Sequence, residues 1–417
     1  MLGADGLIGR AVCDALLAAG HHPLRGTRQP QGSRPPGADD VYVDFNRDLD
    51  ALAWTPRLHR VDAVVNAVGI FAERGGQSFR RIHAETPGAL AQACRDAGIR
   101  RFVQVSALGA DEHARSAFHR SKREGDAAVL AALPTAIVVQ PSLVFSPQGT
   151  SSRMLLTLAA LPWLILPDRG QQLVQPIHVA DLAWLIVRLL DNDAPVPDPR
   201  IAAVGPRALS LADYLATLRH AMGGGRPWIV GIPGAWLARL GALTGGWIDP
   251  DALAMLARGN TASAQPITRV LGRMPRAPEQ FLSATEAREV RRVVFGDIFL
   301  ALGRVAIALV WLVTGVVSLG VYPVAQSLQL LAAVGLHGAL ATLALYAAAL
   351  LDLALGLGTL VLSRRRALYL LQAAIILGYT AIISVALPQF WLHPFGPILK
   401  NLPMLVLIGA LYATGRR

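Results

Sequence analysis

The sequence opens with the stretch Met1-Leu2-Gly3-Ala4-Asp5-Gly6-Leu7-Ile8-Gly9-Arg10, in which three glycines stand three residues apart. An apolar helical pattern follows at once, over residues 7–20. Glycines in such a loop allow the backbone to approach a pyrophosphate, and the N-terminus of the helix adds N–H donors and a positive dipole. The loop alone is a weak signal, so its interpretation depends on the strands and helices around it.

Short apolar runs alternate with helical patterns through residues 1–145. Buried parallel strands are predicted at residues 24–27, 61–67, 101–106 and 136–140, and a second helix at 87–98. Strands that alternate with helices at this spacing are typical of a doubly wound parallel sheet. The sequence therefore predicts an α/β, Rossmann-type fold with a dinucleotide at the glycine loop.

A fold of this type needs a strand before the glycine loop, and only Met1 and Leu2 precede Gly3. We therefore expect the first strand to be truncated in this sequence and further apolar residues to lie upstream in the natural protein.

Residues 146–290 are less regular, and we expect them to form a lobe on the substrate side of one domain that covers residues 1–290. The apolar run 154–166 is too short to cross a bilayer and contains Pro162, which favours a buried or interfacial helix. Further helices are predicted at 180–190 and at 209–222, the second with Ser210 near its N-cap.

The C-terminal part has a different composition. The whole chain is 53% apolar and only 16% charged, and very few of the charged residues lie beyond residue 295. Apolar segments lie near 297–319, 336–362, 367–387 and 398–414, the last of them short. Helices of about 20 apolar residues span a bilayer, so residues 291–417 are predicted to form an all-α bundle of four transmembrane helices. A soluble, hydrophobic helical domain is the alternative.

Arginine placement predicts the orientation of this bundle. The clusters are Arg291 and Arg292, then Arg364, Arg365 and Arg366, then Arg416 and Arg417, whereas the other connections carry only Lys400. Positive residues collect on the cytoplasmic side. We therefore expect a multi-pass protein of the inner (cytoplasmic) membrane with its nucleotide-binding domain in the cytoplasm.

The remaining bulk properties exclude other classes. The net charge is +11, but the basic residues form no recognised nucleic-acid motif, so no nucleic-acid partner is expected. The two cysteines, Cys13 and Cys94, lack metal-ligand spacing and are expected to be buried and reduced, so no metal is predicted.

The end of the second strand predicts the cofactor. Sites that prefer NAD place an acid there, whereas this sequence reads Arg25-Gly26-Thr27-Arg28. We therefore expect NADP(H) to be favoured over NAD(H), with Arg28 as the better ligand of a 2′-phosphate. Asp44 and Phe45 are expected near the adenine. The expected cofactor-binding set so far is Gly3, Gly6, Leu7, Ile8, Gly9, Arg28, Asp44, Phe45, Ala67, Val68 and Gly69.

Residues 1–290 resemble the extended and atypical short-chain dehydrogenase/reductases, in particular the group that contains the NAD(P)H-binding accessory subunit of respiratory complex I. The resemblance is carried by residues 105–110, 120–126, 140–145 and 175–183. It implies an epimerase-like or oxidoreductase activity, with Ser106 and Lys122 as catalytic and cofactor-binding residues. It also places Pro141, Ser142 and Val144 at the cofactor.

The resemblance fails at one position. Active family members carry a tyrosine four residues before the lysine, as general acid/base, and this sequence has Phe118 there. A phenyl ring has no proton to transfer. His119 is a neighbouring titratable group, but adjacency on a helix directs it elsewhere. His178 and Asp181 match a family stretch and are expected to be mainly structural.

The C-terminal part resembles DoxX-like membrane domains, on residues 390–403 and on Asp352 within 351–358. Arg304 and Asp352 are ionisable groups inside predicted spans, which are costly and usually paired or functional. An Asp352–Arg304 pair and a role in quinone, proton or partner handling remain open.

Three hypotheses of function follow. The first is a membrane-tethered reductase or epimerase-like enzyme that binds nicotinamide dinucleotide. The second is a cofactor-binding module without catalysis, a structural, assembly or redox-sensing subunit that contacts a quinone or a respiratory-chain component. The third, a transporter-like protein with a regulatory nucleotide domain, has little support beyond Asp352.

Overall fold

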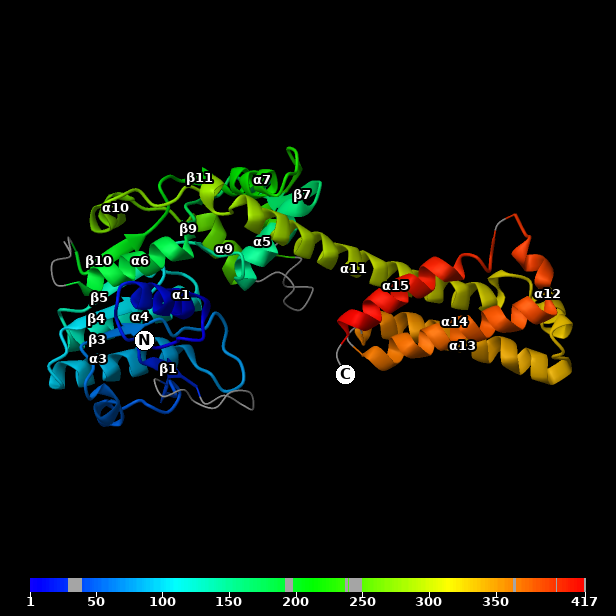
Figure 1. The fold of residues 1–417 in the computed structure, drawn as a ribbon, viewed down its shortest axis with the longest axis horizontal. Coiled ribbons are helices and arrows are strands. Elements are labelled where there is room, and N and C mark those ends of the chain that lie inside the picture. Colours follow the sequence, from blue (N-terminus) through cyan, green and yellow to red (C-terminus); the bar gives the residue numbers. More distant parts are fainter. Residues whose placement is uncertain are drawn as a thin grey trace. The chain divides into compact units, whose positions relative to one another are not determined.

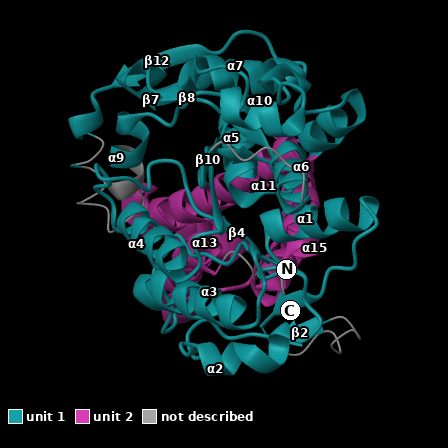
Figure 2. Cartoon of the chain, turned by 90° about the vertical axis from the view of Figure 1, so that its left-hand side faces the viewer, with its two compact units in different colours: residues 1–292 teal, residues 293–417 magenta. Residues whose placement is uncertain are grey.

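The computed structural model describes residues 1–28, 40–191, 198–236, 239, 250–362, 365–394 and 396–415. The chain divides into two compact units, Met1–Arg292 and Val293–Arg417 (Figure 2).

A parallel sheet forms the centre of the first unit. Its strands run in the order β10-β5-β4-β3, and β1 pairs with β2 beyond them. All of these pairings are parallel. The strands are β1 (Arg25–Thr27), β2 (Asp40–Tyr42), β3 (Ala63–Asn66), β4 (Arg101–Val105), β5 (Ile137–Pro141) and β10 (Arg200–Ala203).

Met1 and Leu2 lie between β1 and β3 and join the two halves of the sheet. Leu2 forms parallel bridges with Gly26 and with Asn66. Its N–H donates to the carbonyl of Val65 at 2.8 Å. Leu2 therefore lies between β1 and β3, directly before the glycine loop.

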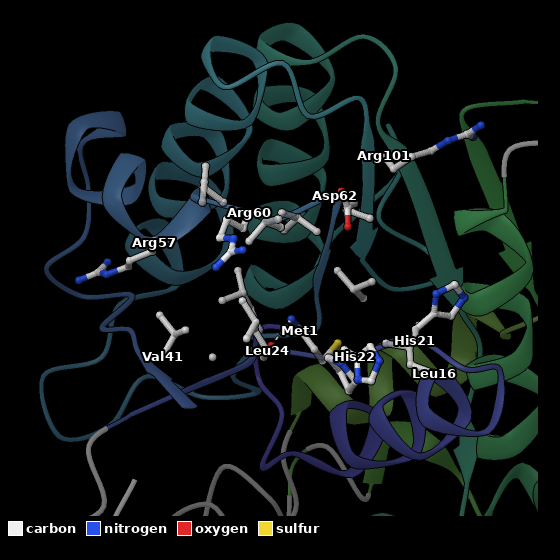
Figure 3. Close-up of a pocket in the computed structure, with 18 of the residues that line it drawn as sticks. Met1, Leu16, His21, His22, Leu24, Val41, Arg57, Arg60, Asp62 and Arg101 are labelled. Carbon is white, nitrogen blue, oxygen red and sulfur yellow. Dashed lines mark hydrogen bonds between the residues drawn. The ribbon is translucent and has the colours of Figure 1, made fainter. Parts of the chain in front are cut away.

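A cavity of about 490 Å³ opens beside Met1, and Figure 3 shows Met1, Leu24 and His22 around it. Its lining includes Ala63 and Arg101, which begin β3 and β4. The cavity therefore lies toward the amino ends of the strands, whereas open α/β sheets bind their ligands at the carboxyl ends. We conclude that it is separate from the nucleotide site.

Helices cover both faces of the sheet (Figure 1). One face packs against α1 (Leu7–Ala18), α6 (Val179–Leu190) and α10 (Gln265–Leu271). The other packs against α2 (Ala51–Trp54), α3 (Thr86–Asp96) and α4 (Ala117–Ala132). Two buried cores on opposite faces make this a doubly wound α/β unit, and the predicted Rossmann-type fold is confirmed.

The lobe of the first unit combines helices with short strand pairs. Its helices are α5 (Thr150–Ala160), α7 (Leu211–Ala221) and α9 (Pro250–Arg258). Its paired strands are β6 (Val144–Phe145) with β9 (Ile177–His178), β7 (Trp163–Pro167) with β12 (Trp228–Ile232), and β8 (Leu173–Val174) with β11 (Leu209–Ser210). The predicted N-cap is confirmed, because the Ser210 side chain accepts from the N–H of Asp213.

The predicted single helix over 154–166 is wrong in its second half. Helix α5 ends at Ala160, and residues 163–167 form β7 instead. Pro162 offers no N–H donor to continue the helix. Residues 163–167 then pair with β12, more than 60 positions later in the chain.

The second unit is entirely helical. It contains most of α11 (Ala284–Val316), which continues as a π-helical turn to Val321, then α12 (Val324–Ala333), α13 (Gly338–Val361), α14 (Arg366–Ala386) and α15 (Asn401–Thr414). Among the described residues, three segments are long and apolar enough to cross a membrane: Ala284–Val321, Gly338–Val361 and Arg366–Ala386. Helix α15 has 14 residues, which is ~21 Å at ~1.5 Å per residue. Helix α12 was not predicted from the sequence.

A buried polar chain crosses the helical unit. The indole N–H of Trp311 donates to Gln372 Oε1 at 3.1 Å, and Gln372 Nε2 donates to Thr359 Oγ1 at 2.8 Å. Gln372 and Thr359 are fully buried.

Of the arginines that predict the orientation, Arg364, Arg416 and Arg417 lie outside the described residues.

Candidate functional site

The glycine loop forms a tight cradle at the carboxyl edge of the sheet. Gly3 adopts a left-handed φ of 74°, and the N–H of Gly6 donates to the carbonyl of Gly3 at 2.9 Å. A Cβ on Gly9 would stand 1.9 Å from the Gly3 oxygen. Leu7 and Ile8 begin α1, where the first N–H groups of a helix have no partner within the helix. The loop therefore fits a pyrophosphate.

The arginines after the loop differ in their surroundings. Arg25 pairs with Asp5 of the glycine loop at 2.9 Å and approaches Asp40 at 3.9 Å. Arg28 is exposed and has no hydrogen bond or ion pair to another described residue. Arg28 therefore remains available to an anionic group at the end of β1.

A cavity of about 350 Å³ brings half of the predicted cofactor-binding residues together. Its lining includes Gly3, Gly6, Arg28, Asp44, Phe45, Ala67, Val68 and Gly69. Some polar groups of these residues form hydrogen bonds within the protein. Asp44 Oδ1 accepts from the N–H of Asn46, and the carbonyl of Phe45 accepts from the Thr86 hydroxyl. The ring of Phe45 packs edge-on against Trp54.

Asn66 shapes the end of β3. This fully buried side chain donates to Gln104 Oε1 at 2.9 Å and accepts from the N–H of Val68 at 3.1 Å. The bond fixes the turn at residues 67–69, where the chain passes the glycine loop. A Cβ on Gly3 would stand 3.0 Å from the Ala67 carbonyl, so the two turns are in direct contact.

Lys122 lies beside this turn. Its Nζ donates to the carbonyl of Val105 at 3.1 Å, and a Cβ on Gly69 would lie 3.1 Å from the same Nζ. Burial lowers the pKa of Lys122 to about 8, and the Asp126 carboxylate opposes that shift. The ammonium group is therefore cationic at neutral pH and adjoins the nucleotide cavity through Gly69.

The predictions did not include His83, which supports the same turn. Its Nε2 accepts from the N–H of Ile70 at 3.0 Å, and its Nδ1 lies 2.8 Å from Ser121 Oγ, which itself donates to the carbonyl of Phe118. Burial, and then the charge of Lys122, lower the pKa of His83 to about 3. His83 is therefore neutral, with Nδ1 as the protonated nitrogen.

Phe118 belongs to an aromatic group at this end of the site. Its ring stacks on Phe71 with centroids 4.9 Å apart and stands edge-on to Phe79 and to His83. Phe71 is 78% exposed. Phe118 is therefore part of an apolar surface that reaches solvent.

Ser106 and Asp126 form a buried pair that the sequence analysis did not recognise. Ser106 Oγ donates to Asp126 Oδ2 at 2.7 Å, and Gln140 also approaches that oxygen. Asp126 Oδ1 is buried without a partner among the described residues. Burial raises the pKa of Asp126 to about 6, although Ser106 and Lys122 act in the opposite direction.

Other predicted residues lie outside the nucleotide cavity. Ser142 donates to the carbonyl of Gln175 at 2.6 Å, between buried Pro141 and half-buried Val144. His119 faces Gly109: its ring atom Cε1 lies 3.1 Å from the position that a Cβ on Gly109 would occupy. Burial, and then the charge of Arg258, lower the pKa of His119.

His178 and Asp181 have structural partners, as expected. His178 accepts from the N–H of Ala180 and caps α6. Asp181 is fully buried, pairs with Arg273, and accepts from the N–H of Arg276 at 2.8 Å. These bonds tie α6 to residues 273–276.

The polar groups of the membrane unit do not form the suggested pair. No ion pair between Asp352 and Arg304 is found in the described part of the chain, and Asp352 Oδ1 and Arg304 Nε are each buried without a hydrogen-bond partner there. Asp352 instead faces Thr314 of α11. Lys400 is exposed, directly before α15.

Comparisons with protein families divide the chain in the same way. Residues 1–205 match the NAD dependent epimerase/dehydratase family, and residues 308–409 match the DoxX-like family.

Two curated relatives are similar to part of this chain. Ceramide reductase of Caulobacter vibrioides is 31% identical over 259 residues, which is 59% of this chain and 76% of that protein. The mitochondrial NADH dehydrogenase [ubiquinone] 1 alpha subcomplex subunit 9 of Mus musculus is 30% identical over 181 residues, 42% of this chain. The alignment covers 46% of that subunit, so the chain spans about half its length.

Solved structures support the fold. Human epimerase family protein SDR39U1 with NADPH matches 69% of this chain and 98% of its own, with a TM-score of 0.51 and 21% identity. At this identity the likeness shows the fold alone.

Proposed function

We propose that this chain, which belongs to the NAD-dependent epimerase/dehydratase family and carries a DoxX-like membrane domain, is an NADP(H)-dependent reductase of carbonyl groups on lipids. The observation that carries the proposal is the cavity of about 350 Å³ in which the glycine cradle, Arg28 and the turn at Gly69 meet.

The described residues fit a nicotinamide dinucleotide. Gly3, Gly6 and Gly9 leave room for the pyrophosphate, because side chains there would fill the cradle. Arg28 binds a 2′-phosphate, which NADP(H) has and NAD(H) lacks. Lys122, beside Gly69, holds the nicotinamide ribose.

Reduction of a carbonyl requires a hydride on carbon and a proton on oxygen. A bound nicotinamide cofactor supplies the hydride. Phe118 cannot supply the proton, and we assign that role to the Ser106–Asp126 pair. When Asp126 is protonated, its O–H donates to Ser106 Oγ, and the Ser106 hydroxyl is then free to donate a proton at the carboxyl end of β4.

Three observations favour a lipid as substrate. Phe118, Phe79 and the exposed Phe71 form an apolar surface next to Lys122 and His83. The chain carries its own membrane domain, and a relative is a ceramide reductase. A long-chain carbonyl lipid of the ceramide type satisfies all three. The arginine clusters favour the cytoplasmic side of the inner membrane for the reductase unit.

The absence of a tyrosine at Phe118 favours a second candidate function. A chain that binds NADP(H) without turnover would serve as a structural, assembly or redox-sensing subunit at the membrane, beside a quinone or a respiratory-chain component. The likeness to the complex I subunit 9 supports this candidate.

NADPH oxidation by the full chain in lipid vesicles, with ketone-bearing ceramide analogues as acceptors, distinguishes the two candidates. We expect acceptor-dependent oxidation that falls about 10²-fold in Ser106→Ala and in Asp126→Asn, as when a general acid is lost. NADPH binding without oxidation in the presence of any carbonyl lipid would contradict the reductase and favour the subunit.

A further inference from the structure

The strand pair β7–β12 presents an apolar face to solvent. Trp163 stands opposite Trp228 in the register, and Ile165 opposite Val230. These four side chains are 65%, 75%, 59% and 49% exposed, whereas the alternate residues Leu164 and Leu166 are buried in the lobe. Parallel strands are ordinarily covered on both faces, and contiguous exposed apolar residues mark an interaction surface.

The face is held in a fixed position by Arg219 of α7. Its Nη1 donates to the carbonyls of Ala159, Ala160 and Leu161 at the end of α5, and its Nε donates to the carbonyl of Gly225. Residues 159–161 lead into β7, and Gly225 leads into β12. One side chain therefore fixes the starts of both strands, and Figure 2 shows β7 and β12 side by side near α7.

The same corner of the lobe contacts the part of α11 that belongs to the first unit. The Arg291 guanidinium lies 3.1 Å from where a Cβ of Gly223 would be. Arg291 belongs to α11, which continues into the apolar segment from Val293 onward. Trp228 follows Gly223 by five residues, so the exposed face begins within ~17 Å of chain from Gly223, at ~3.3 Å per residue.

The composition of the face matches a bilayer surface. Tryptophan is enriched at the membrane–water interface, and two of the four exposed side chains are tryptophans. Arg226 next to β12 and Arg288 and Arg292 on α11 are exposed basic residues at the same corner. Such residues are attracted to anionic lipid headgroups.

We infer that the outward face of β7–β12 is a membrane-docking surface that inserts Trp163, Trp228, Ile165 and Val230 into the headgroup region of the bilayer crossed by α11. A second copy of the chain is a poorer occupant, because a stable protein interface uses about 20–30 residues on each side. Docking brings the lobe into contact with the lipid phase, which goes beyond the proposed reaction and does not depend on it.

Fluorescence quenching tests the inference. The full chain with Ile165→Cys carries a polarity-sensitive fluorophore, in nanodiscs that hold one copy each and contain anionic lipid with a nitroxide on the fifth acyl carbon. Cys13 and Cys94 are buried, so the label is selective. We expect about twofold or stronger quenching, because interfacial groups lie ~5–10 Å into the headgroup and acyl boundary.

The matched control is Leu52→Cys, at a 77% exposed position of α2, which Figure 2 shows far from β7 and β12 in the first unit. Its label should remain unquenched by the lipid nitroxide and open to aqueous iodide. Adding Trp163→Gln and Trp228→Gln to the labelled Ile165→Cys chain should bring its quenching down to the control level. If aqueous iodide quenches the label at position 165 as strongly as the label at position 52, the inference is overturned. The inference is also overturned if the label at position 165 is quenched neither by iodide nor by the lipid nitroxide, because protein and not lipid would then cover the face.

Discussion

Phe118 is the residue that most directly affects the proposed chemistry. Its ring stands among Phe71, Phe79 and His83, close to Lys122 on the same helix. Phe118→Tyr adds a hydroxyl where the family resemblance leads us to expect the general acid, one helical turn before Lys122, whose positive charge would lower the pKa of that hydroxyl. We expect NADPH-dependent turnover of a carbonyl lipid to rise about 10-fold or more.

The control for this change is Phe79→Tyr, which adds the same hydroxyl to the same aromatic group. If Phe118→Tyr and Phe79→Tyr both leave turnover unchanged at equal NADPH affinity, position 118 does not face the reacting carbonyl.

Asp126 gives the proposed reaction a pH dependence. The raised pKa of about 6 means that the carboxyl group loses its proton as pH rises through that value. The charged groups around it are Lys122, whose pKa is about 8, and Arg200, so both remain cationic in this range. We expect kcat/KM to decrease above pH about 6 and the dependence to disappear in Asp126→Asn.

The same group affects stability with a defined sign. A folded pKa above the ordinary value of 3.8 means that the folded state binds the proton more tightly. Its contribution is fully present below pH ~4 and is lost as pH rises from ~4 to ~6. Urea unfolding of the wild type and of Asp126→Asn across this window measures the difference. If the unfolding free energy changes with pH by the same amount in both proteins, the pKa of Asp126 is not raised by folding.

At the scale of elements, the contact between α4 and the π-helical turn Arg80–Glu85 positions the site. A Cβ on Gly125 would stand 1.7 Å from the His83 carbonyl oxygen. Gly125→Ala therefore forces α4 away from His83 and moves Lys122 from Gly69. We expect a loss of about 1–3 kcal/mol in the unfolding free energy of the first unit, together with weaker NADPH binding.

Hydrogen exchange of α4 and of the turn measures this loss locally, which avoids treating two units as one transition. Glu124→Ala, at the neighbouring exposed position of α4, serves as the control and should change neither quantity. Unchanged exchange in Gly125→Ala would mean that the two elements separate without cost.

Elements specified by local patterns could be predicted from the sequence. The helix after the glycine loop and the strands β3, β4 and β5 follow from apolar runs and glycine spacing, because each is determined within about ten residues. Strand β7 could not be predicted, because its partner β12 is distant in sequence and Pro162 interrupts an otherwise helical apolar run.

The residues of the site also divide into those that a local motif predicts and those that only tertiary packing determines. Gly3, Gly6 and Arg28 belong to a local motif and line one cavity. His83 and Asp126 have no local signature, because the packing of α4 against β4 and against the π-helical turn determines their roles.

At the scale of the molecule, the two units should respond to mutation separately. In the membrane unit, Gln372 bridges Trp311 and Thr359. Gln372→Leu leaves the buried indole N–H of Trp311 without an acceptor, which costs about 1–3 kcal/mol. We expect a lower melting temperature of the helical unit in nanodiscs, with NADPH affinity within about twofold of the wild type.

The control for this change is Gln389→Leu, outside the buried chain. A tenfold loss of NADPH affinity in Gln372→Leu would show that the units are energetically coupled, contrary to this expectation.

The central claim is that the cradle of the first unit binds NADP(H) through Arg28. We would measure the affinity of the full chain in nanodiscs for NADPH and for NADH, by cofactor fluorescence, in the wild type, Gly6→Trp, Arg28→Ala and the control Arg269→Ala on α10. The account predicts tighter binding of NADPH, loss of both dinucleotides in Gly6→Trp, and a decrease of about tenfold in Arg28→Ala for NADPH alone, as expected for a lost charge-assisted bond. Equal binding of the two dinucleotides, or an equal loss of both in Arg28→Ala, would contradict the assignment of Arg28, and no binding of either would contradict the nucleotide site itself.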